Sequence, residues 1–590
     1  MPELTFNAYI TAGAIARELS TDNGLETAFR RLRAARVGKV VIEAYRGGEI
    51  TPENRLRELR DAFRSSGFET SGGIMPVEGR GFGRRSVGVE TRCGFFCYTA
   101  QSTRTGVETE IRKLARVFDE VVIDDAFLTS CRCPECDAAR AGRGWRKFRK
   151  DLMAEFSRIL VAAVHEENPN AKLVLKLPQY YDRYQLFGYD PATQGRIFDG
   201  IWIGTETRAP DTFAYGFVEQ YEPFFHVAWI RQCVGAKFQG AWFDYLDCDE
   251  RVFFEQAITT ALTNPRQNTY FCYGDSMFDE KNGLAGCVAK AASLIEKLAS
   301  VARHPAGLPV LRPADADGNG DLFIFDSLGM VGIPVLPVLD LSDAPRNVMI
   351  PAHCACLPDL RRRIEAILEN GGQVIMTLNA LCEAVESDPA LAPIFGYTFS
   401  GIGRVSADAT AVIVGSKRIE LNSPIRLPGD LQPSDAQTEA WAEVPCCEGG
   451  PILVPLISSR RHASGGAAIV WNIGTCVHND FPINERLNVP LRADILRFPQ
   501  SVLDIMQAQA TLHMGCRIAV PPRVAAFPFR DCLVLVNYSD NSARVDISGL
   551  SLMSDAAFSD CAINRCDADG ANLSPRSFLA IPLAAPIVMT

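Results

Sequence analysis

The chain has 590 residues, of which 47% are hydrophobic and 22% charged, and its formal net charge is −10. This length exceeds what one hydrophobic core supports, so several domains are expected. The acidic balance argues against a nucleic-acid partner, and the lack of a long apolar stretch argues against a membrane span. The N-terminal segment has no basic signal-peptide start, and nineteen cysteines with scattered spacing favour a reducing, cytoplasmic location.

Short apolar runs alternate with longer helical patterns through the first part of the chain. The runs are 5–11, 39–45, 68–77, 120–127, 172–179, 200–208, 240–246 and 268–274, and the helical patterns include 24–36, 53–66, 106–118, 144–167, 250–263 and 285–302. Strands that are apolar at nearly every position are typical of parallel sheets buried on both faces. Eight such units predict an α/β fold that begins with a (β/α)8 TIM barrel over residues 1–305.

A doubly wound open sheet is the alternative architecture for this part of the chain. That fold usually carries a glycine-rich phosphate turn after its first strand, and no such turn is present. The glycine-rich segment 79–85 follows the third apolar run instead, where it predicts a flexible loop.

The composition changes after Arg303. Residues 304–321 are rich in Pro, Gly and Asp and predict a linker. A middle α/β domain is expected over 306–510, with strands near 322–328, 347–353, 372–378 and 467–474 and helices at 358–369 and 494–509. Short alternating runs at 532–539 and 543–550 predict a small antiparallel β-domain over 511–590.

Acidic residues end several of the predicted barrel strands, and active sites of such barrels lie at those carboxyl ends. They are Glu43 on the second strand, Asp124 and Asp125 on the fourth, Glu206 on the sixth and Asp244 on the seventh. Because side chains alternate along a strand, one of Asp124 and Asp125 should face the barrel axis and the other the helices. The expected substrate-binding residues are Glu43, Tyr45, Arg46, Asp124, Lys176, Gln179, Tyr180, Trp202, Arg208 and Trp242.

Acids and aromatic rings on one rim suit a sugar substrate. Aromatic faces stack on sugar rings, and a pair of carboxyl groups can act on the glycosidic bond. A single acid at a strand end also fits a helix cap or an ion pair, so the prediction depends on several acids sharing one rim. None of the seven histidines falls at a predicted strand end in the barrel, which argues against a catalytic metal held by imidazoles.

Cys131, Cys133 and Cys136 form a C-x-C-x-x-C cluster just after the fourth run. Structural zinc takes four ligands, and Cys97, on the loop after the third strand, is the best fourth candidate, with Cys93 as the alternative. A chance grouping among nineteen cysteines is the other interpretation. A closed four-cysteine site would be structural, and no organic cofactor is indicated.

The segments Cys97-Tyr98-Thr99-Ala100 and Cys131–Cys136, with the barrel and the domains after it, resemble glycoside hydrolase family 42, the β-galactosidase family. The resemblance implies a flavodoxin-like or glutaminase-like trimerisation domain in the middle, to which residues 321–335 are similar. It also implies a homo-oligomer, with a trimer as the expected form, and a four-cysteine zinc site. Cys354 follows His353 in the middle domain without a glycine-rich nucleophile elbow, which favours assembly over amidotransfer.

The catalytic residues depart from this family. Its members place an Asn-Glu pair on the fourth strand and a nucleophilic Glu on the seventh, where this chain has Asp124-Asp125 and Asp244. The α-galactosidase and α-fucosidase clans offer a second scheme, with Asp125 as nucleophile and Glu206 as acid/base. Both schemes share Asp125, so the catalytic candidates are Asp125, Glu206 and Asp244.

The predicted function is a retaining glycoside hydrolase that cleaves a small oligosaccharide or glycoside with two carboxylates. Two alternatives stay open at this point. One is a non-catalytic carbohydrate-binding or assembly protein with a degenerate barrel. The other is a sugar isomerase or aldolase, in which Lys176 would form a Schiff base.

Overall fold

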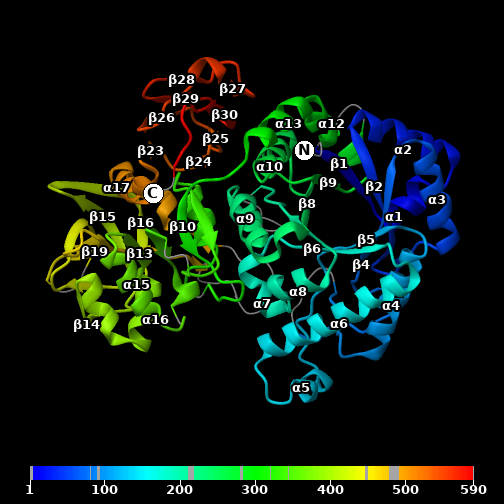
Figure 1. The fold of residues 1–590 in the computed structure, drawn as a ribbon, viewed down its shortest axis with the longest axis horizontal. Coiled ribbons are helices and arrows are strands. Elements are labelled where there is room, and N and C mark those ends of the chain that lie inside the picture. The colour runs from blue at the N-terminus through cyan, green and yellow to red at the C-terminus, as the bar shows by residue number, and fades with distance from the viewer. Residues whose placement is uncertain are drawn as a thin grey trace. The chain divides into compact units, whose positions relative to one another are not determined.

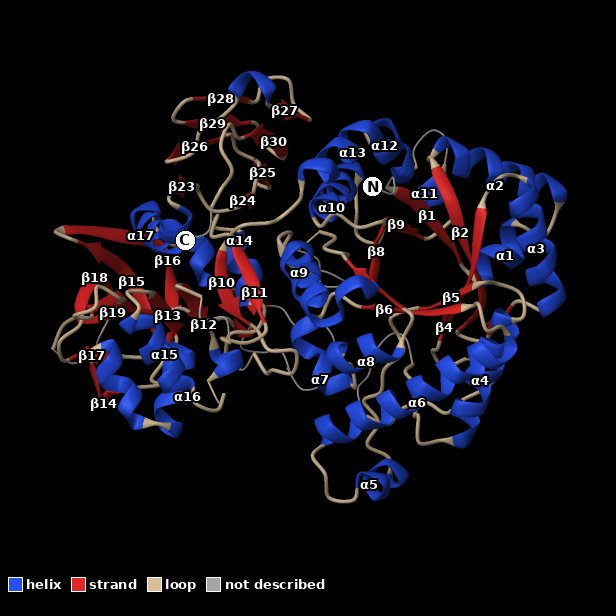
Figure 2. Cartoon of the chain, in the orientation of Figure 1, coloured by secondary structure: helices blue, strands red, loops and turns tan. Residues whose placement is uncertain are grey.

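The computed structural model describes residues 4–79, 81–88, 94–209, 218–279, 283–318, 320–342, 345–355, 357–445, 449–477 and 491–588. The chain divides into two compact units, with the main division between Ser300 and Val301. Figure 1 shows the course of the chain, and Figure 2 shows its helices and strands.

The first unit is a closed barrel of eight parallel strands. They are β1 (Thr5–Ile10), β2 (Val37–Arg46), β4 (Glu69–Met75), β5 (Glu120–Ile123), β6 (Lys172–Leu177), β7 (Gly200–Gly204), β8 (Phe238–Asp244) and β9 (Gln267–Phe271), with the two-residue β3 (Glu49–Ile50) antiparallel to the end of β2. Each strand pairs with the next, and β1 pairs with both β2 and β9, which closes the sheet. All eight predicted strands are confirmed, and the open-sheet alternative is wrong.

Helices surround the barrel between successive strands (Figure 2). They are α1 (Ala12–Glu18), α2 (Asp22–Ala34), α3 (Glu53–Ser65), α4 (Gln101–Ala115), α5 (Pro134–Arg140), α6 (Trp145–Glu167), α7 (Tyr184–Phe187), α8 (Pro191–Ile197), α9 (Glu222–Val234), α10 (Glu250–Leu262), α11 (Asp275–Phe278), α12 (Leu284–Lys290) and α13 (Ala292–Val301). The predicted helices are present, although the pattern at 285–302 forms two helices. None of the described helices is both long enough and apolar enough to span a bilayer.

Inward-pointing side chains fill the barrel interior. Tyr9, Val41, Val122, Val174, Trp202 and Trp242 form one buried cluster. They come from β1, β2, β5, β6, β7 and β8. Because side chains two residues apart on a strand face the same way, the next inward-facing residues lie at the carboxyl ends of these strands. The cluster is therefore the floor beneath the polar residues at the rim.

The second unit contains a nine-stranded sheet in the order β11-β10-β12-β13-β20-β19-β18-β15-β16. The first five strands are parallel: β11 (Val335–Val338), β10 (Leu308–Leu311), β12 (Asn347–Ile350), β13 (Gln373–Thr377) and β20 (Ala467–Trp471). The antiparallel part is β19 (Ile452–Arg461), β18 (Gln437–Val444), β15 (Ala407–Val414) and β16 (Lys417–Leu427). Its helices are α14 (Ile324–Gly329), α15 (Leu360–Glu369), α16 (Leu378–Ser387) and α17 (Gln500–Thr511), and two small ladders pair β14 (Tyr397–Ile402) with β17 (Leu431–Pro433) and β21 (Cys476–Val477) with β22 (Leu491–Arg492).

Two predictions for this unit are wrong. Residues 322–328, expected to be a strand, contain the buried helix α14, because a short run that is apolar on all sides fits a buried helix as well as a strand. The predicted linker contains β10, whose four residues are too few to show against the surrounding prolines. The other three predicted strands and both predicted helices of this region are present.

The C-terminal residues form two four-stranded antiparallel sheets that share one apolar core. One sheet has the order β23 (Arg517–Ala519), β26 (Ala543–Ser548), β29 (Gly570–Leu573) and β28 (Arg565–Asp567), and the other β24 (Val524–Phe529), β25 (Cys532–Asn537), β30 (Ser577–Pro582) and β27 (Phe558–Ser559). The predicted fold class, a TIM barrel followed by sheet domains, is confirmed. The boundaries at 305 and 510 stay predictions.

Asp321 connects three segments of the second unit. Its buried carboxylate accepts hydrogen bonds from Ala352 N (2.9 Å), Thr377 Oγ1 (2.5 Å) and Asn379 Nδ2 (2.9 Å). We expect Asp321→Ala to lower the free energy of unfolding of this unit by about 3 kcal/mol, because the buried donors of Ala352 and Thr377 lose their acceptor and Asn379 loses one of its two. Urea unfolding followed by circular dichroism measures this loss, and the exposed Asp555→Ala is the control. Equal unfolding curves for the two variants would contradict the prediction.

Candidate active site

The acidic residues predicted at the barrel rim come together with three basic ones. Glu43, Lys176 and Asp244 belong to the ends of β2, β6 and β8, and the remaining members follow β5 and β7 directly or end β2. All of them except Asp125 and Arg46 are buried. The full set is Glu43, Arg46, Asp124, Asp125, Lys176, Glu206, Arg208 and Asp244. Charged groups this deeply buried are tolerated only when they are paired.

Lys176 is the central cation of the site. Its Nζ lies 2.5 Å from Glu206 Oε1, 2.9 Å from Asp125 Oδ2 and 3.6 Å from Asp124 Oδ1. Burial alone would lower the pKa of Lys176, but the three carboxylates outweigh it and hold that pKa above its ordinary value. A lysine that stays protonated cannot attack a carbonyl, so this geometry argues against the Schiff-base alternative.

Asp124 and Asp125 both face the interior of the site, contrary to the prediction that they point opposite ways. β5 ends at Ile123, so strand alternation no longer governs the two residues that follow. Asp124 is buried, whereas the Asp125 side chain is 27% exposed. Among the described residues, no hydrogen bond or ion pair engages Asp125 Oδ1. That oxygen is available to a bound molecule.

Glu206 has the most strongly altered acidity of the rim carboxyls. Burial raises the pKa of Glu206 to about 7, although Lys176 and Arg208 act in the opposite direction. Its Oε2 is buried and lacks a hydrogen-bond partner among the described residues. A carboxyl with this pKa can carry a proton at neutral pH.

Asp244 is bound on both oxygens by Arg208. Arg208 Nε lies 2.9 Å from Oδ1 and Nη2 lies 2.5 Å from Oδ2, and Leu246 N also donates to Oδ1. This bidentate pair is buried. Such a pair fixes Asp244 in place.

Arg46 joins the two acids on the other side of the site. Its Nε donates to Glu43 Oε1 (2.9 Å) and its Nη2 to Asp124 Oδ2 (2.8 Å), while its guanidinium lies 4.9 Å from the centre of the Phe271 ring. Tyr9 Oη also donates to Glu43 (2.7 Å). Tyr9 and Phe271 were not predicted, because only acids at strand ends were considered as site residues. Their positions at the ends of β1 and β9 could have indicated that they face the site.

Several predicted substrate-binding residues are buried. Trp202 is fully buried in the barrel interior, with Lys39 near the start of β2 5.9 Å from its ring. Tyr45 is also fully buried and donates its hydroxyl to Val77 O (2.8 Å). Gln179 and Tyr180 are buried as well, and Trp242 forms the floor, with its ring 4.5 Å from Lys176 Nζ.

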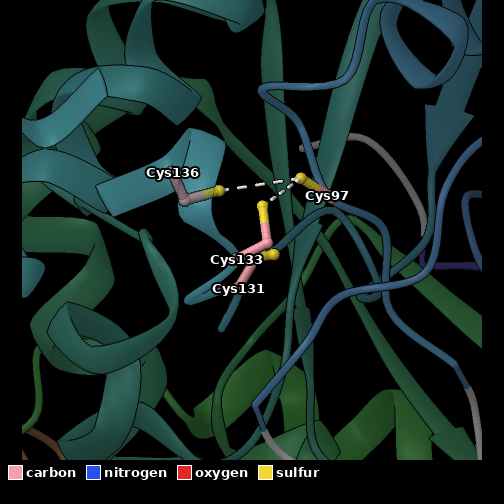
Figure 3. A group of neighbouring side chains, drawn as sticks. All are labelled: Cys97, Cys131, Cys133 and Cys136. Atoms are coloured by element: carbon pink, nitrogen blue, oxygen red, sulfur yellow. Dashed lines mark hydrogen bonds between the residues drawn. The ribbon is translucent and has the colours of Figure 1, made fainter. Parts of the chain in front are cut away.

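The four predicted cysteines form one cluster (Figure 3). The sulfurs of Cys97, Cys131, Cys133 and Cys136 lie within 4.8 Å of one another, and all four residues are buried and free of disulfides. Cys97 Sγ is 3.8 Å from Cys133 Sγ and 3.6 Å from Cys136 Sγ. Four thiolates around a tetrahedral zinc are spaced by about 3.8 Å, so these residues fit a metal ion. Cys93 lies outside the described residues.

The glycine-rich segment predicted to be a flexible loop is attached to this cluster. Arg84 Nη2 donates to Cys97 Sγ (3.1 Å) and also pairs with Glu135, while Val87 N donates to Cys131 Sγ (3.4 Å). Backbone N–H and guanidinium donors to sulfur are the contacts that stabilise thiolates. The cluster therefore connects the loops that follow β4 and β5.

The comparisons with known proteins identify this barrel. Residues 1–286 match the family model described as a probable glycosyl hydrolase, catalytic domain. The protein is a glycoside hydrolase. An uncharacterized protein of Saccharolobus solfataricus is 23% identical to this glycoside hydrolase over 453 residues, which are 70% of this chain and 72% of that protein.

Solved structures extend the likeness of fold to nearly the whole hydrolase. A GH42 β-galactosidase from G. stearothermophilus superposes with a TM-score of 0.63 at 12% identity, covering 99% of this chain and 98% of the other. The α-L-fucosidase isoenzyme 2 of Paenibacillus thiaminolyticus superposes with a TM-score of 0.64 at 12% identity, covering 99% of each. The predicted distant resemblance to family 42 is thus confirmed in fold.

Cys354 in the second unit is not placed as a nucleophile. Its thiol is buried and donates to Leu311 O (3.0 Å), and burial raises the pKa of Cys354 above its ordinary value. A nucleophilic cysteine needs a lowered pKa and access to solvent. These contacts agree with the prediction against amidotransfer.

The buried charges of the hydrolase give a pH-dependent stability prediction. Lys176→Met leaves Glu206, Asp124 and Asp125 without their shared cation, so we expect the folded-state pKa values of Glu206 and Asp124, which are already raised by burial, to rise further. At pH values between the unfolded-state pKa and the raised folded-state pKa of these acids, the folded state binds more protons than the unfolded state. The free energy of unfolding therefore falls as the pH increases. We expect a loss of about 4 kcal/mol at pH 8 and less than about half of that at pH 5.

Urea unfolding of the Lys176→Met variant at the two pH values measures this difference. Lys147→Met is the control, because the Lys147 side chain is 68% exposed and its pair with Asp151 is on the surface. A loss at Lys176 that does not change with pH would contradict the electrostatic account.

Proposed function

We propose that the protein is a retaining glycoside hydrolase in which Asp125 is the nucleophile and Glu206 the acid/base. The supporting observation is that Lys176 Nζ binds both carboxyls, at 2.9 Å and 2.5 Å. The two bound oxygens are therefore at most about 5.4 Å apart. Retaining enzymes place their carboxyls roughly 5–5.5 Å apart, whereas inverting enzymes need a wider gap of about 6.5–9.5 Å for water.

The two carboxyls have the properties that these roles require. Asp125 holds Lys176 through Oδ2 and leaves Oδ1 to attack the anomeric carbon. Glu206, whose pKa is raised to about 7 by burial, donates its proton to the leaving oxygen and then takes a proton from water. Lys176 holds Asp125 in place during both steps through its contact with Oδ2.

Asp244 is the less suitable partner for Asp125. Both of its oxygens are bound by Arg208, so attack or proton transfer would first have to break a buried bidentate pair. We assign Asp244 and Arg208 to binding and electrostatics. Asp124, Glu43 and Arg46 are the candidates for contacts with sugar hydroxyls.

We propose a short glycoside or oligosaccharide of a neutral hexose as substrate. Family-42 β-galactosidases and an α-L-fucosidase share the fold, and each acts on a neutral sugar according to its name. The rim offers carboxylates and guanidinium groups, which bind hydroxyls. A degenerate, non-catalytic barrel is the second candidate, and it is disfavoured because the carboxyl pair and its lysine are all present.

Asp125→Asn and Glu206→Gln should have different kinetic signatures. We expect Asp125→Asn to lower kcat on every glycoside by ~10³-fold or more, because no covalent intermediate forms. We expect Glu206→Gln to lower kcat/KM by ~10²–10⁴-fold on 4-nitrophenyl glycosides. The loss should be much smaller with a 2,4-dinitrophenyl leaving group, which departs without protonation. The wild-type rate should fall as the pH rises through about 7, and Glu206→Gln should lose this limb.

A panel of 4-nitrophenyl and 2,4-dinitrophenyl glycosides, with and without azide, measures these signatures. Azide should give a glycosyl azide of retained configuration with Glu206→Gln, because it attacks the covalent intermediate, and one of inverted configuration with Asp125→Asn, because it replaces the missing nucleophile. Asp119→Asn, with a side chain 73% exposed, is the control just before β5. Near-normal rates in Asp125→Asn would exclude this nucleophile.

We also propose that the four cysteines hold a structural zinc ion. The donor set, its burial and the sulfur spacing fit a closed tetrahedral site, which leaves no position for a substrate. In this role the ion would fix the loops that carry Cys97 and Cys131. The cytoplasmic location and the homo-oligomer, with a trimer as its expected form, stay predictions from the sequence.

Metal analysis of the purified protein should give about one zinc per chain. We expect Cys133→Ser to lower the thermal midpoint by roughly 10 °C through loss of the ion. Cys566→Ser, a half-buried cysteine outside the cluster, should change the midpoint little. A metal-free wild-type protein with an unchanged midpoint would rule out the zinc site.

A further inference from the structure

Three hydrogen bonds fix Asp125, and one of them takes no part in the proposed reaction. The backbone N–H donates to Asp124 Oδ1 (2.8 Å), and Oδ2 receives Lys176 (2.9 Å). The third contact is at the backbone carbonyl, which accepts the hydroxyl of Tyr189. Among the described residues, no other donor reaches this carbonyl.

Tyr189 is buried among other aromatic side chains. Its ring lies 5.1 Å from the ring of Tyr184, which in turn lies 6.3 Å from the ring of Tyr180. Tyr180 is also buried. The three rings pack together, and Tyr189 donates its hydroxyl to Asp125 from this group.

The local backbone explains how Tyr189 reaches Asp125. α7 ends at Gly188, which has a φ of +91°. A Cβ at this position would lie 2.7 Å from Met153 Cγ and 3.0 Å from Arg149 O, so the turn needs glycine for both conformation and space. The turn directs Tyr189 back toward the end of β5.

The same segment also binds the loop that follows Asp125. Phe187 O accepts from Thr129 N (3.0 Å), and Arg149 donates to both Leu186 O and Ser130 O (2.6 Å each). The residues on the C-terminal side of Asp125 are thus tied to α7. The segment 184–189 acts as a rigid template for this stretch.

We propose that Tyr189, held by its packing with Tyr184 and Tyr180, is a positioning residue that sets the direction in which Asp125 presents Oδ1 to the anomeric carbon. This inference rests on the proposed role of Asp125 as nucleophile. Asp125 lies beyond the last residue of β5, so the sheet does not hold its peptide. A misplacement of about 1 Å at a reacting atom can cost on the order of 100-fold in rate, so one hydroxyl on this carbonyl has a large effect.

Tyr189→Phe tests the proposal, because it removes the hydroxyl and keeps the ring. The matched control is Tyr45→Phe, which removes another fully buried barrel tyrosine hydroxyl that donates to a backbone carbonyl, here that of Val77. The probe is the 2,4-dinitrophenyl 2-deoxy-2-fluoro glycoside of the sugar that the glycoside panel selects. Intact-mass spectrometry follows the rate at which it labels the protein.

We expect Tyr189→Phe to slow labelling by ~10–100-fold, with the thermal midpoint close to that of Tyr45→Phe and the inhibition constant of the free sugar unchanged. The loss should be the same for good and poor leaving groups, since it arises at the nucleophile and not at the acid. Tyr180→Leu should give a smaller loss of the same kind, because it loosens the packing of the three rings while Tyr189 keeps its own bond to Asp125. It serves as the second variant if Tyr189→Phe does not fold.

Labelling of both Tyr189→Phe and Tyr180→Leu at the wild-type rate, or an equal loss in Tyr45→Phe, would overturn the positioning role. The proposed function is tested separately by Asp125→Asn, which must not be labelled at all. An unlabelled Asp125→Asn together with a fully active Tyr189→Phe would leave the nucleophile in place and remove only the role of Tyr189.

Discussion

The site depends on one buried cation shared among three acids. Removing an ammonium group and several carboxylates from water costs several kcal/mol for each ion, and only close mutual pairing offsets this cost. Lys176 supplies that pairing for Asp124, Asp125 and Glu206. Burial raises the pKa of Glu206 to about 7 even though Lys176 and Arg208 both act to lower it. Glu206 can therefore hold a proton at neutral pH.

The remaining basic residues divide the other acids between them. Arg208 engages Asp244 on both oxygens, and Arg46 connects Glu43 with Asp124. These paired acids are fixed in place. The contacts therefore separate the acids that arginines hold from Asp125 and Glu206, which share Lys176. This division is the physical basis for preferring Glu206 over Asp244 as the partner of Asp125.

The segment after β5 carries both chemistry and support within a few residues. Asp125 lies at its start and Cys131 six residues later, so the thiolate cluster and the carboxyl belong to one continuous loop. Tyr189 holds the first end through the Asp125 carbonyl. Arg84 and Val87 bind the sulfurs at the other end, and so bring the loop after β4 into the same unit. The proposed role of Asp125, beyond the end of β5, requires such support from the loop.

The sequence by itself determined the barrel, the set of rim acids and the four cysteines. Apolar periodicity is a local property, and the carboxyl ends of parallel strands meet at one rim whatever the details of packing. The local pattern gave the wrong prediction at α14, because a short apolar run is compatible with both a strand and a buried helix, and this one forms a helix. Only the tertiary structure showed that Asp124 and Asp125 face the same way, that Tyr45 and Trp202 are buried, and that Tyr189 reaches Asp125. Each of these facts depends on where a strand stops or on contacts between residues far apart in the chain, which composition and spacing do not encode.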